Sequence, residues 1–261
     1  MTTIQHDDVK VMPRENAQRL LKDVRSIYKE TLESQGIYYK HDENDMTIGY
    51  ALISGPEETP FSFGNYLFEF NFPYNYPYSP PKVIFHNTFD KIRFHPNLYR
   101  NGKVCISILN TWKGEQWSSC QNIKSVLLTL CMILDNKPLL NEPGITEQNV
   151  DFEGYNSIIK YSNLRYCVLE LQNKKILPKR FLMFYEIIQN NFKNKYEKII
   201  EYMNELQSKK ENRKKHIISV SIYNMSNIQI DYKGLRKDIE NYYNNNIKIS
   251  NSVNSNNEDN S

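Results

Sequence analysis

The chain has 261 residues, of which 39% are hydrophobic and 24% are charged, with a formal net charge of +3. This length suffices for one or two domains with a sizeable core. This small net charge does not indicate a nucleic-acid-binding domain, because such domains usually concentrate Lys and Arg on one face. No stretch approaches the roughly 18 apolar residues of a membrane span, and the first residues lack the apolar segment of a secretory signal. We therefore expect an intracellular protein, cytoplasmic or alternatively nuclear, with neither nucleic acid nor a membrane as partner.

The four cysteines, Cys105, Cys120, Cys131 and Cys167, form no C-x-x-C pair, and no histidine lies at zinc-ligand spacing from them. We therefore expect no metal site. In a reducing compartment, Cys131 and Cys167 are predicted to be small buried side chains.

The first predicted helix covers 13–28, after a flexible segment at 1–12. Its apolar face is predicted to consist of Ala17, Leu20, Leu21, Val24, Ile27 and Tyr28. Four segments rich in Tyr, Phe and Ile then read as strands: 37–40, 47–54, 66–72 and 82–85. Four consecutive strands predict an antiparallel meander.

The run F-P-Y-N-Y-P-Y-S-P-P at 72–81 cannot lie inside a sheet, because proline lacks the backbone donor, so we expect an ordered extended loop. Residues 86–121 show little regular pattern, which in a compact domain favours a functional segment. The largely apolar helix at 123–134 is predicted to pack across the sheet.

The region 151–243 is predicted to be a mainly helical extension outside the first core, with helices at 152–172, 179–207 and 234–243 and a strand-like run at 217–230. The basic run Lys209–Lys215 indicates a solvated helix end or linker, with a nuclear-import or acidic-partner site as the alternative. The Asn- and Ser-rich residues 244–261 are predicted to form a disordered tail.

Cys105 follows a turn that carries Asn97, within the run F-H-P-N-L-Y-R-N-G-K-V-C. A nucleophilic cysteine needs a partly exposed thiol and a nearby hydrogen-bond donor for the oxyanion formed when a carbonyl is attacked. Asn97 can supply that donor. The pair predicts an active site that forms a thioester.

This order of elements resembles the ubiquitin-conjugating enzymes over roughly 13–150. The motifs that carry the resemblance are S-G-P at Ser54–Pro56, T-P-F at Thr59–Phe61, Y-P-Y-S-P-P-K-V at Tyr76–Val83, H-P-N at His95–Asn97 and N-G-K-V-C-I-S-I-L at Asn101–Leu109. Two further motifs, N-T-W-K-G at Asn110–Gly114 and N-E-P-G at Asn141–Gly144, look like the larger Z-type conjugating enzymes and the conjugating domain of Apollon. The resemblance implies an α+β conjugating fold at 13–150 with a helical extension.

The resemblance also implies that Cys105 accepts ubiquitin from an activating enzyme and passes it to a protein lysine. Asn97 would steady the oxyanion or the surrounding loop, although it could merely close a turn through its own backbone. His95 is expected to fix the turn, with proton transfer as the alternative. No metal or organic cofactor is implied, because ATP is used by the upstream activating enzyme.

Two departures from the family pattern affect the expected partners and chemistry. Leu139 and Leu140 stand where many members carry an acidic or hydroxyl side chain that deprotonates the lysine, so Asn141 and Glu142 are the expected substitutes. The familiar W-S-P of the ligase-facing loop becomes W-S-S-C at 117–120.

By resemblance, a RING-type ligase would bind Tyr78, Ser119, Cys120 and the start of the first helix. Arg14 and Lys22 on that helix would contact an acidic domain of the activating enzyme, with a solvated helix face as the alternative. A non-catalytic variant of the fold that only binds ubiquitin is the competing function, but such variants lack the thiol at this spacing. A related modifier in place of ubiquitin also remains open.

Overall fold

The computed structural model describes residues 11–87, 89 and 91–248. Its central feature is an antiparallel sheet whose strands follow one another in space as in sequence: β1 (Ile37–His41), β2 (Ile48–Ser54), β3 (Asn65–Asn71) and β4 (Lys82–Phe85). The register pairs Tyr38 with Leu52 and Ala51 with Phe68. The predicted four-stranded meander is confirmed.

Helix α1 (Arg14–Lys29) begins after Pro13, whose carbonyl accepts a hydrogen bond from the Ala17 amide. Three of its apolar residues are buried as predicted: Leu20, Val24 and Ile27. Leu21 and Tyr28, which we expected on the same face, are 40% and 48% exposed. Each directly follows a buried residue, and one residue of helix turns the side chain by about 100° away from the core.

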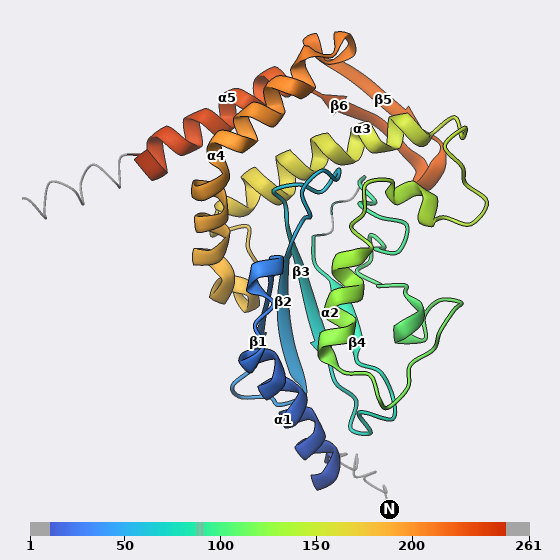
Figure 1. The fold of residues 1–261 in the computed structure, drawn as a ribbon. Coiled ribbons are helices and arrows are strands. Elements are labelled where there is room, and N and C mark those ends of the chain that lie inside the picture. Colours follow the sequence, from blue (N-terminus) through green and yellow to red (C-terminus); the bar gives the residue numbers. More distant parts are fainter. Residues whose placement is uncertain (1–10, 88, 90, 249–261) are drawn as a thin grey trace, which may run out of the picture.

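The two faces of the sheet pack against different parts of the chain, because side chains alternate along a strand. Ala51 and Ile53 of β2 belong to the main core cluster, which also contains the buried side of the predicted crossing helix, α2 (Ile123–Met132) (Figure 1). Tyr50 and Leu52 point to the opposite face and join a second cluster. Both faces of the sheet are therefore covered.

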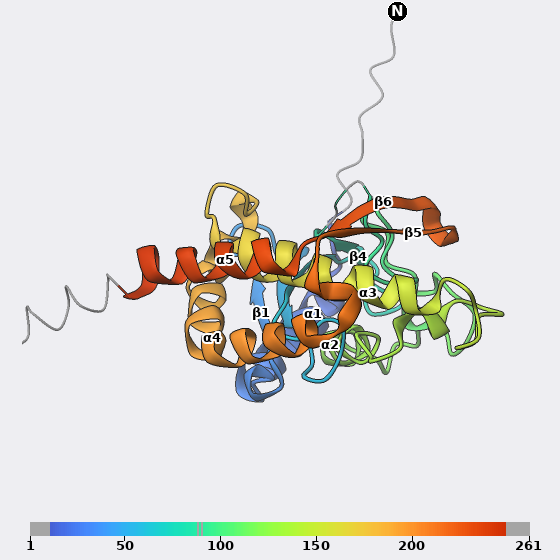
Figure 2. The same ribbon diagram turned by 90° about the horizontal axis from the view of Figure 1, so that it is seen from above.

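The chain after the sheet and α2 is mainly helical, as predicted, and the run that was expected to be strand-like, 217–230, forms a two-stranded hairpin. Its elements are α3 (Phe152–Ser162), 3-10 turns at Lys179–Phe184, α4 (Tyr185–Ser208), β5 (His216–Val220), β6 (Met225–Ile230) and α5 (Tyr232–Tyr242). Helices α3, α4 and α5 and the hairpin lie together over one end of the sheet (Figures 1 and 2).

The expectation that this extension lies outside the first core is wrong. Tyr155 and Ile159 of α3 are fully buried in the main cluster, while Phe181 and Phe184 are fully buried against the second face of the sheet. The extension supplies the apolar side chains that a two-sided sheet requires, so it completes the core.

The disordered tail was predicted to begin at residue 244, but the chain is still ordered there. Residues 243–248 form π-helical turns after α5, and Ile247 is only 7% exposed within the main cluster. A buried isoleucine orders the beginning of the Asn-rich stretch, so the prediction is wrong for 244–248. The rest of that stretch, 249–261, and residues 1–10 of the expected flexible start lie outside the described residues.

The basic run at Lys209–Lys215 contains a 3-10 turn, Lys210–Arg213, between α4 and β5, and its charged side chains are exposed. This placement agrees with the solvated-linker interpretation. Within the described ranges, none of the helices is long and apolar enough to cross a bilayer.

Candidate active site

The irregular segment after β4 is held in place by short backbone pairings. Lys103 bridges to Ile84 of β4, and Val104 bridges to Leu98. The Phe85 amide donates to the Gly102 carbonyl at 2.8 Å. Gly102 has a φ of +83°, and a Cβ there would come within 3.0 Å of the Phe85 carbonyl oxygen, so glycine suits this turn. The sheet therefore positions the residues that lead into Cys105.

Asn97 and Cys105 are joined by two hydrogen bonds. The Cys105 amide donates to the Asn97 carbonyl at 2.9 Å, and the Asn97 side-chain Nδ2 donates to the Cys105 carbonyl at 2.5 Å. Asn97 is 9% exposed, so these bonds are shielded from water. The two residues that the sequence pairs chemically are thus in direct contact, with the amide on the backbone of Cys105.

The Cys105 thiol is less accessible than the sequence led us to expect. The residue is only 2% exposed, and Sγ donates to the Thr111 carbonyl at 2.7 Å. The Thr111 hydroxyl anchors this cover by accepting from the Ile106 amide at 3.0 Å. The expectation of a partly exposed thiol is wrong in this conformation, because the loop after Cys105 folds back over the sulfur. Thr111 itself is exposed.

His95 is fully buried at the start of the same turn, and its Nδ1 accepts from the Asn97 amide at 3.0 Å. Burial, with a smaller effect of the Arg93 charge, lowers the pKa of His95 to about 3. A ring that stays neutral and holds the Asn97 backbone supports the expected turn-fixing role.

The candidates for activating a lysine have other partners within the described residues. Asn141 donates from Nδ2 to Asp135 Oδ2 at 2.8 Å, and Glu142 Oε2 accepts from the Tyr223 hydroxyl of the extension. Leu139 is fully buried, whereas Leu140 is 38% exposed. Asp135 is an acid in this loop that we did not single out from the sequence.

The expected ligase surface comes together from three segments. Tyr78 is 68% exposed on the Pro-rich loop, and Ser119 and Cys120 are exposed on the later loop. The indole of Trp117 donates to the Pro77 carbonyl at 2.6 Å, which joins the two loops. The assembly thus places the predicted residues on neighbouring loops.

Arg19 joins α1 to the later loop. Its guanidinium donates to the Ser119 and Gln121 carbonyls, each at 2.8 Å, and pairs with Asp23 at 3.0 Å. The sequence did not predict these contacts of Arg19, because a basic residue on an amphipathic helix usually lies on the face exposed to solvent. Arg14 and Lys22, the predicted contacts of the activating enzyme, are exposed on the same helix.

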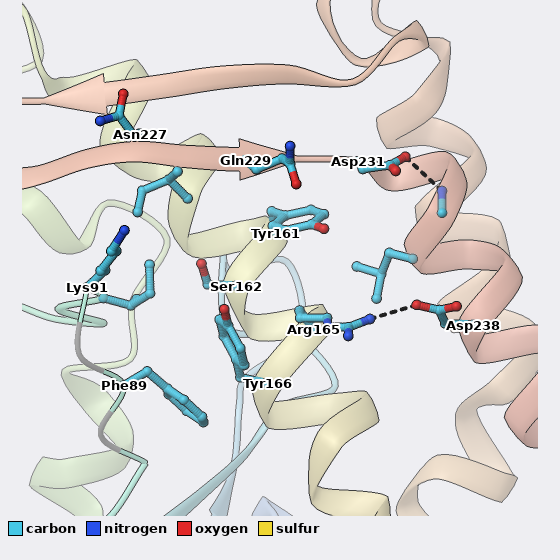
Figure 3. A pocket seen from close by; sticks show the side chains of 14 residues that line it. Phe89, Lys91, Tyr161, Ser162, Arg165, Tyr166, Asn227, Gln229, Asp231 and Asp238 are labelled. Atoms are coloured by element: carbon cyan, nitrogen blue, oxygen red, sulfur yellow. Dashed lines mark hydrogen bonds and ion pairs between the residues drawn. The ribbon is translucent and has the colours of Figure 1, made fainter.

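A hollow of about 550 Å³ lies elsewhere, between α3, β6 and the start of α5 (Figure 3). Tyr166 stacks on Phe89 at its base, with ring centroids 4.3 Å apart, and Arg165 pairs with Asp238 at 2.7 Å. No cysteine lines it among the described residues. In the part of the chain that the structure describes, no group of three or more His, Cys, Asp or Glu is arranged to hold a metal ion.

Comparison with known proteins agrees with this fold. The family described as "Ubiquitin-conjugating enzyme" matches residues 19–157, and the chain belongs to this family of transferases. The conjugating fold inferred from the resemblance is therefore confirmed.

Within the family, the chain is similar to "Ubiquitin-conjugating enzyme E2 Z". The Xenopus tropicalis protein is 37% identical over 190 residues, covering 68% of this chain and 60% of the relative. The human protein is 38% identical over 183 residues, covering 66% of this chain and 51% of the relative. The resemblance to the Z-type enzymes is confirmed, although the chain spans only about half to 60% of these relatives.

Two further similarities complete the comparison. Human "Dual E2 ubiquitin-conjugating enzyme/E3 ubiquitin-protein ligase BIRC6" is 34% identical over 177 residues, which cover 65% of this chain and 4% of that protein. A solved structure of human ubiquitin-conjugating enzyme E2 G1 aligns with a TM-score of 0.41 at 30% identity, covering 48% of this chain and 97% of that one.

Proposed function

We propose that this protein accepts ubiquitin as a thioester on Cys105 and transfers it to lysines of protein substrates. The observation that carries the proposal is the double hydrogen bond between Cys105 and Asn97, which presents one particular cysteine beside an amide donor. Cys167 also accepts from asparagine amides, with Asn65 Nδ2 on its carbonyl and Asn87 Nδ2 on its sulfur, but it is fully buried, and burial raises the pKa of its thiol to about 12, which disfavours the nucleophilic thiolate. Cys105 also argues against the non-catalytic alternative, because a module that only binds ubiquitin needs no thiol here.

The transfer proceeds in two steps. Cys105 first loses its proton to solvent; its thiolate then attacks the carbonyl of the thioester on the activating enzyme, and that enzyme's cysteine leaves as a thiolate. A lysine amine then attacks the Cys105 thioester, the Cys105 thiolate leaves, and the amine loses a proton to solvent or a nearby carboxylate. ATP is consumed only by the activating enzyme, so the residues named here need no cofactor.

Loading requires the Cys105 sulfur to leave the Thr111 carbonyl. Thr111 is exposed, and moving it also breaks the hydrogen bonds of its hydroxyl with the backbone of Val104 and Ile106. Once the thioester forms, the sulfur no longer carries a proton to donate to Thr111, and the cover loses its hydrogen bond. Loading and opening are therefore coupled.

The partners follow from this chemistry. We propose an activating enzyme that docks near Arg14 and Lys22, and a RING-type ligase that docks on Tyr78, Ser119 and Cys120. Glu142, or Asn141, would assist the incoming lysine. The proposed site of action is the cytoplasm, with the nucleus as the alternative, because reducing conditions keep the thiol free.

A charging assay tests the proposal and identifies the modifier. The protein is incubated with ATP, an activating enzyme and either ubiquitin or a related modifier, and the products are separated without reducing agent. We expect a band that thiols remove, and for Cys105→Ser a band that resists thiols, because an oxyester is less reactive than a thioester. No adduct with any combination of activating enzyme and modifier would overturn the proposal.

A further inference from the structure

Tyr223 of the extension occupies the turn of the β5–β6 hairpin with a φ of +57°, which a bulky residue adopts at a cost in strain. Asp151, just before α3, fixes the start of this turn: its carboxylate accepts from the Ser221 hydroxyl at 2.6 Å and from the Ile222 amide at 2.8 Å. The Tyr223 carbonyl in turn accepts from Arg100 at 2.6 Å. The turn is therefore held on both sides.

The Tyr223 ring contacts the turn that carries Asn97. Its centroid lies 4.3 Å from the Arg93 guanidinium carbon, and the Tyr99 ring lies 3.6 Å from the same carbon. Arg93, stacked against both rings, donates to the His95 carbonyl at 3.4 Å and to the Pro96 carbonyl. Stacking on tyrosine thus orients the guanidinium that holds the backbone of the H-P-N motif at His95 and Pro96.

The Tyr223 hydroxyl reaches a second loop, where it donates to Glu142. Burial and this hydrogen bond to Glu142 raise the pKa of Tyr223, so the phenol remains a donor across the physiological range. Glu142 lies in the N-E-P-G motif, directly after the leucines that replace the usual acidic or hydroxyl side chain. One side chain of the extension therefore bridges the Asn97 turn and the candidate lysine-activating loop.

We propose that Tyr223 is a positioning residue for ubiquitin transfer, which orients Glu142 toward the incoming lysine and steadies the turn that presents Asn97. The inference rests on the proposed function of Cys105 and extends it, because it gives the extension a direct part in the second step. The contacts that the structure describes for the Tyr223 side chain include none with Cys105. Tyr223 acts through Arg93 and Glu142.

The test separates loading from transfer. Tyr223→Phe keeps the ring on Arg93 and removes only the hydroxyl, so loading of Cys105 in a non-reducing gel should match the unmodified protein. The single-turnover rate of discharge to free lysine should fall about 10-fold, and loss of the ring in Tyr223→Leu should lower it further, toward the ~100-fold that a misplaced catalytic group can cost. Tyr242→Phe is the matched control, because Tyr242 in α5 also has a hydrogen-bonded hydroxyl, at 3.1 Å from Gln189 Nε2, but contacts neither loop.

A double-mutant cycle identifies the route. If the hydroxyl acts through Glu142, the double variant Tyr223→Phe/Glu142→Gln should discharge at nearly the same rate as Glu142→Gln alone. Discharge by Tyr223→Phe at the unmodified rate would overturn the inference and leave the function of Cys105 standing. Equal falls in loading and discharge, with a lower melting temperature, would also overturn it by showing a purely structural role. Failure of the unmodified protein to load would instead contradict the proposed function itself.

Discussion

At the residue scale, the contact between Asn97 and Cys105 shows how one amide can hold a loop and still assist chemistry. A primary amide has two N–H groups. One of them donates to the Cys105 carbonyl at 2.5 Å, and under the proposed function the other is the donor for the oxyanion. The two roles considered for Asn97, holding the loop and donating to the oxyanion, are therefore compatible.

Replacing Asn97 by alanine should impair transfer more than loading. We expect discharge from Cys105 to free lysine to fall by about 100-fold, as for loss of one oxyanion donor, while loading by the activating enzyme largely persists. Single-turnover discharge with a pre-loaded protein measures this. Asn101→Ala is the control, because Asn101 lies exposed in the same segment, where its Oδ1 accepts from the Lys103 amide and makes no described contact with Cys105. Equal losses in both steps would point to a collapsed loop.

His95 should make the stability of the protein depend on pH. Its pKa is about 3 when folded and about 6.5 when unfolded. Between these values the unfolded chain binds more protons, so the free energy of unfolding falls as the pH is lowered from 6.5 toward 3. In His95→Gln this dependence should be shallower, by up to about 1.4 kcal/mol per pH unit. Urea unfolding across that range checks it, and parallel slopes for the two proteins would show that His95 is protonated in the fold.

At the scale of elements, the buried carboxylate of Asp151, just before α3, helps to hold the hairpin against that helix. Asp151 is 9% exposed and accepts hydrogen bonds from Ser221 and Ile222, which lower its pKa against the opposing effect of burial. The carboxylate therefore stays ionised while the hairpin is docked. This contact places Tyr223 over the active-site loops.

Asp151→Asn should loosen the hairpin, because one carboxylate oxygen becomes an amide that cannot accept from the turn. We expect a loss of about 1–3 kcal/mol in the free energy of unfolding and faster hydrogen exchange in β5 and β6. Glu153→Gln serves as the control, since Glu153 is exposed on α3, two residues further along. Unchanged exchange in the hairpin would show that other contacts dock it.

Several elements were predictable because their signals are local. Segments rich in Tyr, Phe and Ile predicted β1 to β4, and the largely apolar run at 123–134 predicted α2. The contacts of the site could not be predicted in this way, because they join residues far apart in the sequence: Tyr223 with Glu142, and Arg19 with Ser119. The group that covers the Cys105 thiol is the backbone carbonyl of Thr111. Every residue has such a carbonyl, so the residue type at position 111 does not predict the contact.

At the scale of the whole molecule, the conjugating domain and its extension share their cores. Apolar residues that recur every three or four positions indicate that a helix has a buried face, but they do not indicate which surface that face covers. The structure places Phe181 and Phe184 on the second face of the sheet, where Arg180 also pairs with Glu69. The extension is thus part of the folded unit that holds the active site.

Phe181→Ala should destabilise the sheet and the extension together. Phe181 is fully buried and packs edge-on against Tyr50, with ring centroids 5.5 Å apart. We expect a loss of about 3–5 kcal/mol in the free energy of unfolding, in one cooperative transition. Met183→Ala, two residues further along and 45% exposed in the unmodified protein, should change it little. Two separate transitions would show that the extension folds independently.

The central claim is that Cys105 alone carries the modifier, and replacing each cysteine in turn tests it most directly. Cys105→Ala, Cys120→Ala, Cys131→Ala and Cys167→Ala are each incubated with ATP, ubiquitin and the activating enzyme that loads the unmodified protein, and run without reducing agent. Only Cys105→Ala should lose the thiol-sensitive adduct. An adduct that survives in Cys105→Ala, or that disappears in Cys120→Ala instead, would contradict the account.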